Sequence, residues 1–332
     1  MTAAVTVTQA LVGPRHHGVV RFGLALHDAM HAIGLPLEHA WSPDVADMAS
    51  AGGAGGVHLQ FTDRLFGDSP GGAARAVADI ASRIRVTVTL HDLPQASDGR
   101  SADQRAAAYA DVAARSAGVA VSSDHERELL RDIGVDVTTV TVIPLSIGPP
   151  APVRCRRAGV PSIGVFGFLY PGKGHEEVIA ASAALPPDVE IHAVGEPSAG
   201  HDALVDDLTA RAGAQGRRFH VTGHVSDQAL VEVLQRITVP VVAHTHVSAS
   251  GSLGSWLSAG RRPLVVANRY SREVVGRNPG MLTLYSPPDL PQAIRGAFND
   301  PQSTWLAQGL VPRPTPTDTA NAYHAFFERW HR

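Results

Sequence analysis

The sequence contains a single cysteine, few aromatic residues and no long apolar segment. Its one cysteine, Cys155, excludes an intramolecular disulfide framework and favours a reducing compartment, so a cytoplasmic location is expected. No run of 18 or more apolar residues occurs, so no membrane-spanning helix is predicted. The first residues, 1–12, lack the basic segment and cleavage site of a secretory signal.

Charge of either sign is also scarce, since charged residues make up 18% of the chain and the net charge is -3. No global attraction to nucleic acid or to acidic membranes is therefore expected. The 17 histidines are scattered and form no zinc-type spacing with cysteine. His244 and His246 would share a face if the strand expected at 239–243 continued through them, but the spacing offers no third ligand. They are interpreted as structural or donor-lining histidines, and no metal site is predicted.

Apolar, β-branched segments alternate with Ala-rich helical segments along nearly the whole chain of 332 residues, which is long enough for two domains. Strands that are apolar throughout fit a parallel sheet covered on both faces, with helices as right-handed crossovers. The predicted fold class is α/β, with two Rossmann-like, doubly wound domains in tandem. Strands are predicted at 4–12, 57–61, 84–90, 118–121, 139–143, 162–166, 189–194, 218–221, 239–243, 263–267 and 281–284.

The proline-rich segment 149–161 has no periodicity and is expected to be a linker. It separates an N-terminal domain (1–148) from a C-terminal domain (162–310). The last stretch, 311–332, ends in an aromatic, helical pattern that has no obvious place in the second sheet. We expect this helix to cross back to the N-terminal domain.

The second domain opens with a strand, a glycine-containing loop and a helix, over residues 162–181. Gly167 and Gly174 permit close approach of a ligand to the backbone, and the helix N-terminus favours an anion. Lys173 adds a positive charge for a phosphate. The spacing fits neither a P-loop nor a dinucleotide fingerprint, and an ordinary strand-to-helix turn is the alternative interpretation.

A second loop of the same kind follows the strand predicted at 239–243. Residues 248–255 are all Ser, Ala, Gly or Leu, and either Ser250 or Ser252 is expected to cap the helix that follows. The amides of its first turn point outward, so two helix starts at one sheet edge converge on a diphosphate. A serine-rich cap without a ligand is the alternative. The amides and hydroxyls predicted to bind the anion belong to Ser250, Gly251, Ser252 and Leu253.

In their order along the chain these motifs resemble the GT-B glycosyltransferases, in particular glycosyltransferase family 4, and the similarity covers roughly residues 10–285. The motifs that carry this similarity are "RHHGVVRFGLALHDAMHAIGL", "TVTLHDLP", "GVAVSSDHERELLRDIGVDVTTVTVIPLSI", the triplet from Lys173 to His175, "FHVTGHVSDQALVEVLQRI" and "SAGRRPLVVA". The resemblance implies a metal-independent transferase of the hexosyltransferase type that retains anomeric configuration, with a cleft between its two domains. It implies no cofactor, a nucleoside-diphosphate sugar as donor substrate and a hydroxyl acceptor.

The resemblance also implies roles for individual residues. The two implied catalytic residues are His91, which would lie near the reacting sugar, and Lys173, which would lie at the leaving diphosphate. Gly18 would let the backbone approach the donor phosphate, and the backbone near Val225 would meet the nucleobase. The implied acceptor-side residues are His16, His17 and Asp92, with simple solvation as the alternative for the two histidines. The implied donor-binding residues are Gly18, Gly167, Lys173, Gly174, Val225, Ser250, Gly251, Ser252, Leu253 and Ser255.

The sequence departs from the family pattern in its donor motif. Val247 and Ser255 stand where members often carry a pair of glutamates, and Phe168 stands where a basic residue is common. Arg261 and Arg262 offer additional positive charge near the donor motif, but they are expected to be solvated surface charges. A non-catalytic sugar-nucleotide-binding or scaffold protein is therefore the alternative function, and a sugar-nucleotide epimerase is a third reading that requires acidic groups in the cleft. A homodimer is left open.

Overall fold

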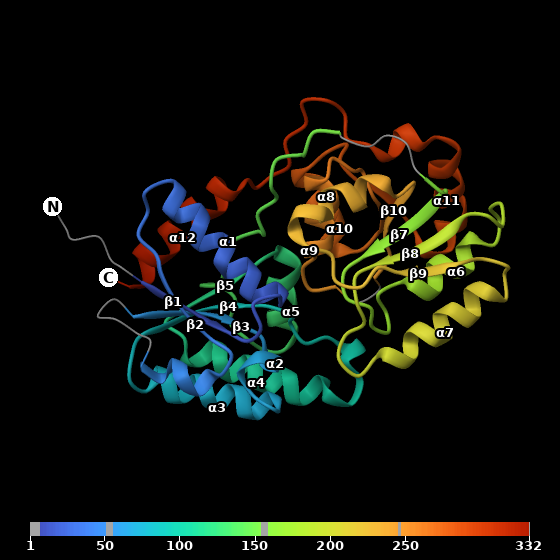
Figure 1. Cartoon of the computed structure of the whole chain (residues 1–332). Helices are drawn as coiled ribbons and strands as arrows, with labels where there is room; N and C mark the ends of the chain where they lie inside the picture. The colour runs from blue at the N-terminus through green and yellow to red at the C-terminus, as the bar shows by residue number, and fades with distance from the viewer. Residues whose placement is uncertain (1–6, 51–55, 154–158, 245–246, 332) are drawn as a thin grey trace. The chain divides into compact units, whose positions relative to one another are not determined.

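The computed structural model of the chain describes residues 7–50, 56–153, 159–244 and 247–331 (Figure 1). It divides into two compact units: unit 1 comprises Met1–Ser146 and Pro314–Arg332, and unit 2 comprises Ile147–Arg313. The predicted linker falls at the start of unit 2, and its residues 154–158 lie outside the described residues. Within the described ranges, no helix is long and apolar enough to span a bilayer.

Unit 1 contains a parallel sheet of six strands in the order β2-β1-β3-β4-β5-β6. The strands are β1 (Thr8–Val12), β2 (Glu38–Ser42), β3 (Val57–Phe61), β4 (Val86–Leu90), β5 (Gly118–Val121) and β6 (Thr141–Val142). The helices are α1 (Gly18–Ala32), α2 (Asp63–Phe66), α3 (Pro70–Ala81), α4 (Ala102–Arg115), α5 (Asp124–Asp132) and α12 (Pro316–Trp330), with 3-10 helices at Val45–Ser50 and Ala96–Ser101. The strand order reverses between β1 and β3, and ligands of doubly wound sheets bind outside the carboxyl ends of strands at such a point.

Strand β2 is the one strand in the described part of the chain that the sequence did not predict. Its residues, EHAWS, are mostly exposed, and it pairs only with β1 at the edge of the sheet. An edge strand needs no continuous apolar run, so hydrophobic periodicity gives it no signal.

Unit 2 contains a second parallel sheet of six strands, in the order β12-β11-β10-β7-β8-β9. The strands are β7 (Ser162–Phe166), β8 (Glu190–Val194), β9 (Phe219–Val221), β10 (Val239–Val242), β11 (Leu264–Val266) and β12 (Thr283–Tyr285). The helices are α6 (His175–Ser182), α7 (Asp202–Gly213), α8 (Asp227–Arg236), α9 (Gly251–Ser258), α10 (Arg269–Arg277) and α11 (Leu290–Asn299), with 3-10 helices at Pro287–Asp289 and Pro301–Thr304. Taken from the other edge, this is the Rossmann strand order, and its reversal lies between β7 and β10. The predicted class, two Rossmann-like domains of α/β type, is confirmed.

Helix α12 packs within unit 1, beside α1 (Figure 1). Its buried aromatic residues include Tyr323, whose hydroxyl lies 2.8 Å from the Thr89 hydroxyl of β4. Trp330 lies so close to β5 that a Cβ atom at Gly118 would come within 2.5 Å of the indole ring. The last helix of the chain is therefore fitted closely to the sheet of the first unit.

Candidate functional site

The strand reversal of unit 2 brings together the two loops that the sequence singled out. The loop after β7 carries Lys173, and the loop after β10 leads into α9. The Lys173 ammonium lies 3.4 Å from the Ser252 hydroxyl, which lies 3.1 Å from the Ser250 hydroxyl. A positive charge, two hydroxyls and a helix N-terminus therefore meet at the carboxyl ends of β7 and β10.

Lys173 is the only lysine in the sequence, and its side chain is buried, with 6% of the residue exposed. Among the described residues it forms no ion pair with a carboxylate, and its ammonium lies 5.7 Å from the centre of the Tyr170 ring. Burial lowers the pKa of Lys173 from its ordinary value of 10.5 to about 8. A buried cation that no acid neutralises is costly, so this ammonium is suited to an anionic ligand.

The amides at the start of α9 are not all available. The Ser250 amide donates to the Tyr270 hydroxyl at 3.1 Å, and the Leu253 amide donates to the Ser250 hydroxyl at 3.2 Å. Ser250 is thus the cap, one of the two serines that the sequence offered. Within the described ranges the amides of Gly251 and Ser252 donate to no protein group, so the predicted set of four anion-binding amides narrows to these two.

The two positions Gly167 and Gly174 of the first loop require glycine for different structural reasons. Gly167 has a φ of 117°, and a Cβ atom there would lie 2.9 Å from the Lys173 ammonium, so a larger residue would displace the charge. Gly174 has a φ of 99°, and a Cβ atom there would lie 2.5 to 2.7 Å from Ala243 at the end of β10. Gly167 therefore makes room for the site, whereas Gly174 is required by the packing of the loop on β10.

Val225 and Ser255 are the remaining residues of unit 2 that were predicted to bind the donor. Val225 lies in the loop between β9 and α8, half-buried against the core around Trp256. The Ser255 hydroxyl donates to the Gly251 carbonyl at 3.1 Å, which leaves only its oxygen lone pairs for a ligand. Val247 is buried in the same core, and its apolar side chain offers no polar group to a ligand.

Arg261 is a correction to the sequence interpretation, which expected a solvated charge. Only 1% of the residue is exposed, and its guanidinium donates to the Leu234 and Gln235 carbonyls at 3.1 Å and to the Thr238 carbonyl at 3.0 Å. These carbonyls lie at and just beyond the C-terminal end of α8, where a cation is favourable. Arg261 therefore holds α8 in place and does not face the anion site.

In unit 1 the predicted residues follow β1 and β4. His17 caps α1, since its Nδ1 accepts the Val19 amide at 3.2 Å, and burial lowers the pKa of His17 below its ordinary value. His16, beside it, is exposed. A Cβ atom at Gly18 would meet nothing within 4 Å, so the space beside this residue is open, and its role at the donor phosphate stays a prediction.

His91 and Asp92 come directly after β4. The His91 imidazole is buried and lies 2.8 Å from the Gln60 amide oxygen, and burial lowers its pKa to about 3, with His17 adding to the effect. Asp92 is the only non-glycine residue of the described ranges with a positive φ, at 52°. Such backbone strain persists only where surrounding contacts impose it.

Those contacts come from two residues that the sequence analysis did not identify. Arg105 of α4 donates to the Asp92 carbonyl at 2.6 Å and forms a two-bond ion pair with Asp63 at 3.0 and 3.1 Å. The Tyr109 hydroxyl donates to the His91 carbonyl at 2.6 Å. Both residues are buried on one face of α4, and an Arg on the apolar face of a helix is the sequence signal that was missed.

The described residues contain no group of three or more side chains suited to a metal ion. His244 is buried at the end of β10, whereas His246, the other member of the pair, lies outside the described residues.

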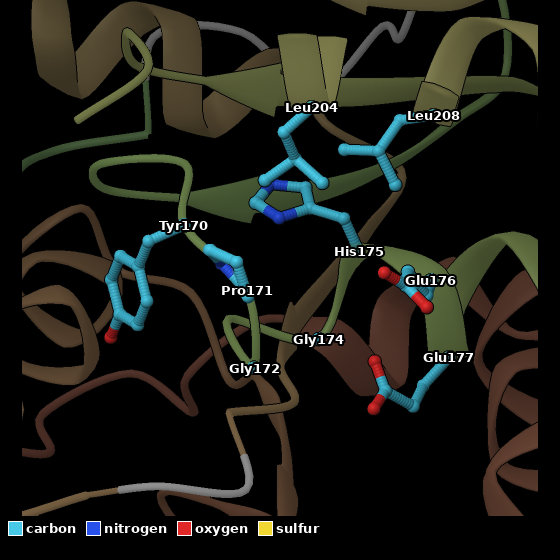
Figure 2. A pocket seen from close by; sticks show the side chains of 9 residues that line it. All are labelled: Tyr170, Pro171, Gly172, Gly174, His175, Glu176, Glu177, Leu204 and Leu208. Carbon is cyan, nitrogen blue, oxygen red and sulfur yellow. The ribbon is translucent and has the colours of Figure 1, made fainter. Parts of the chain in front are cut away.

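A cavity of about 80 Å³ lies in unit 2 at the start of α6. Figure 2 shows the residues that line it. The imidazole of His175 points toward Leu204 and Leu208 of α7, and neither ring nitrogen has a hydrogen-bond partner among the described residues. Burial lowers the pKa of His175 to about 3. Glu176 and Glu177 also line this cavity, and their charges would repel a diphosphate.

Comparison with solved structures places this geometry in a known fold. No protein-family model matches the sequence, and no curated protein matches it either. HepE from Anabaena, solved in complex with UDP-glucose, is similar with a TM-score of 0.67 and 16% identity over 98% of this chain and 95% of that one. Sucrose-phosphate synthase from Thermosynechococcus elongatus gives 0.67 at 15% identity, with 98% and 95% covered. The lipopolysaccharide outer core galactosyltransferase WaaB gives 0.59 at 11% identity, with 98% and 99% covered. These structures are GT-B glycosyltransferases, and at such identities the likeness establishes the GT-B fold.

Proposed function

We propose that the protein is a glycosyltransferase that moves a sugar from a nucleoside-diphosphate sugar to a hydroxyl acceptor. The observation that carries the proposal is Lys173, a buried ammonium beside the first turn of α9 that has no acidic partner among the described residues. A diphosphate would supply the missing negative charge, and the Gly251 and Ser252 amides would donate to the same anion.

The neighbours in fold support a uridine nucleotide as the carrier, because HepE was solved with UDP and with UDP-glucose. In glycosyl transfer the bond between the sugar and the diphosphate breaks, and negative charge grows on the leaving oxygen. Lys173 and the dipole of α9 would stabilise that charge in the transition state. We also propose that transfer needs no metal ion, because these groups supply the positive charge; activity should then persist in excess chelator.

We propose further that transfer retains the anomeric configuration, by attack of the acceptor on the face that the diphosphate leaves. The acceptor proton would pass to the departing phosphate oxygen as the new sugar–oxygen bond forms. Support comes from the acids near His91: Asp63 is held by two bonds from Arg105, and Asp92 lies 3.3 Å from the same guanidinium. Both carboxylates are thus already paired with the Arg105 guanidinium, which makes them weaker nucleophiles for a double displacement. Slow hydrolysis of UDP-glucose should release the α anomer first, which proton NMR detects before mutarotation.

The residues that follow β1 and β4 in unit 1 remain the proposed acceptor side. His16, His17 and Asp92 would contact the acceptor, and His91 a sugar or acceptor hydroxyl. We propose a cytoplasmic location, because a single cysteine favours a reducing compartment.

A non-catalytic sugar-nucleotide-binding protein is the second candidate. It is favoured by Val247, which is buried and apolar, and by Ser255, whose hydroxyl proton is already donated to the Gly251 carbonyl. A ribose would then be held by weaker contacts than a carboxylate provides.

Calorimetric titration with UDP and UDP-glucose, followed by assay of UDP release, separates these functions. The transferase should bind both ligands and release UDP, and Lys173→Ala should lower turnover by about 10²-fold, the scale of losing one preorganised charge. Arg272→Ala, which removes an exposed cation of α10, is the matched control and should leave turnover unchanged. Binding without release favours the second candidate. A wild-type protein that binds neither ligand excludes the uridine carrier, and one that also binds no other nucleoside diphosphate refutes both functions.

A further inference from the structure

A continuous line of hydrogen bonds runs through unit 1 from the backbone of α1 to the imidazole of His91. The Gln9 amide nitrogen donates to the Gly23 carbonyl at 2.8 Å, and the Gln60 amide nitrogen donates to the Gln9 amide oxygen at 2.7 Å. The Gln60 amide oxygen lies 2.8 Å from His91 Nε2. Gln9, Gln60 and His91 are all buried, so solvent does not compete for these bonds.

The direction of every bond in this line follows from its first member. A backbone carbonyl can only accept, so Gln9 must turn its NH₂ group toward Gly23 and its oxygen toward Gln60. Gln60 must then donate to Gln9, which turns its own oxygen toward His91. Because that oxygen only accepts, His91 Nε2 must carry the proton.

Gly23 is the residue that lets the line form. It lies inside α1, where glycine is unfavourable by roughly 1 kcal/mol relative to alanine. A Cβ atom there would lie 2.2 Å from Leu11 and 3.3 Å from both Gln9 and Gln60. The helix therefore approaches β1 and β3 closely enough for its carbonyl to reach Gln9 only because this position has no side chain.

The other ring nitrogen of His91 remains an acceptor. Nδ1 makes no hydrogen bond within the described part of the chain. Burial, with a further contribution from His17, lowers the pKa of His91 to about 3, so the ring stays neutral near pH 7. A neutral ring with its proton on Nε2 offers a lone pair at Nδ1, which suits a hydroxyl donor and disfavours a phosphate oxygen.

We propose that Gln9 and Gln60 are positioning residues that hold His91 in the Nε2–H tautomer and so reserve its Nδ1 as an acceptor for a substrate hydroxyl. The identity of that hydroxyl rests on the proposed function, since both the donor sugar and the acceptor carry hydroxyls. The tautomer does not depend on the proposed function, because it is a property of the protein without ligand.

The first experiment is long-range proton–nitrogen NMR of the ligand-free, ¹⁵N-labelled protein, with the His91 signals identified by their loss in His91→Asn. We expect Nε2 at the shift of a protonated nitrogen and Nδ1 at the shift of an unprotonated one. A protonated Nδ1, or exchange between the two tautomers, overturns the proposal without touching the proposed function.

Two variants of Gln60 test the positioning role. In Gln60→Glu a protonated carboxyl group reproduces both bonds, and a carboxylate still accepts from Nε2, so the tautomer should be kept. In Gln60→Leu the acceptor is lost, so we expect tautomer exchange and about a tenfold loss in kcat/KM for UDP-glucose, with UDP affinity unchanged. A purely packing role predicts the opposite order, because a buried acid is tolerated less well than leucine. Thermal unfolding checks that both variants fold, and an unfolded Gln60→Leu leaves Gln60→Glu and the wild-type spectrum to decide.

Titration with UDP and then UDP-glucose identifies the source of the hydroxyl. A change of the Nδ1 signal with UDP-glucose and not with UDP assigns a hydroxyl of the donor sugar. If UDP-glucose binds and leaves Nδ1 unchanged, the hydroxyl belongs to the acceptor. If neither ligand binds, the proposed function with a uridine carrier is contradicted, whereas the tautomer is still decided by the spectrum of the ligand-free protein.

Discussion

Replacing Lys173 by methionine should have two effects of opposite sign, because its charge is buried and has no acidic partner in the part of the chain that the structure describes. The side chains have similar length, so the change removes the charge and keeps most of the packing. We expect the ligand-free variant to be more stable than the wild type and to bind a nucleoside diphosphate more weakly.

The magnitude follows from the pKa of Lys173. Burial lowers it from 10.5 to about 8, and at 1.36 kcal/mol for each pKa unit the charged form costs the folded protein about 3 kcal/mol at pH 7. Between pH 8 and 10.5 the unfolded chain binds a proton that the folded protein does not. The wild type should therefore gain stability as the pH rises through this window, and below it the penalty is fully present. The variant should lack this pH dependence and gain up to about 3 kcal/mol at pH 7.

The assay must report on unit 2 alone, because two units can unfold in separate transitions. Hydrogen exchange of peptides from β7 and β10, measured across a urea series, gives the free energy of unfolding of this sheet. Added at 100 times its dissociation constant, UDP should stabilise the wild type by about 2.7 kcal/mol. At the same UDP concentration the variant should gain much less, since losing one charged hydrogen bond lowers affinity by roughly 10- to 100-fold.

The matched control is Arg272→Met, which removes an exposed cation from α10 and should change neither quantity. The reasoning is refuted if Lys173→Met destabilises the sheet by 1 kcal/mol or more, or if its UDP affinity equals that of the wild type.

Three further predictions concern unit 2. Gly167→Ala should weaken UDP binding at least as much as Lys173→Met, because its Cβ would lie 2.9 Å from the ammonium and φ is 117°; calorimetry measures this, and unchanged affinity contradicts it. Tyr270→Phe removes the acceptor of the Ser250 amide and should cost about 1 kcal/mol in urea unfolding, whereas an unchanged midpoint would mean the bond contributes nothing. The pKa of His175 falls from 6.5 to about 3 in the folded state, so the unfolded chain takes up the proton first and stability drops below pH 6.5. At pH 5 this loss should reach about 2 kcal/mol, and it should be absent in His175→Leu.

Most of the fold could be predicted from local pattern. Strands such as β3, β4 and β10 are apolar along their whole length, which marks a sheet covered on both faces. The edge strand β2 has no such pattern, and only its pairing with β1 makes it a strand. The order of strands, and hence the two points where it reverses, is a property of the sheets that no single segment specifies.

Like the fold, the candidate site could be predicted only in part from local sequence. Glycines, a lysine and a serine cap can be read within short loops, and the structure brings Lys173 against Ser252 across 79 positions of sequence. The sequence could not predict that the Ser250 amide donates to the Tyr270 hydroxyl, and this bond leaves fewer amides available to an anion. Arg105 was overlooked as well, because its acidic partners lie on other elements.

By itself the sequence determined which apolar segments form the buried strands, where each anion-binding turn begins and which charged group it carries, because these depend on neighbours within a few residues. Only the tertiary structure decided that Lys173 is buried, that Arg261 caps a helix end and that Gln9, Gln60 and His91 form one line. The reason is that burial and hydrogen bonding between distant residues depend on strand order and register. Hydrophobic periodicity does not encode either of them.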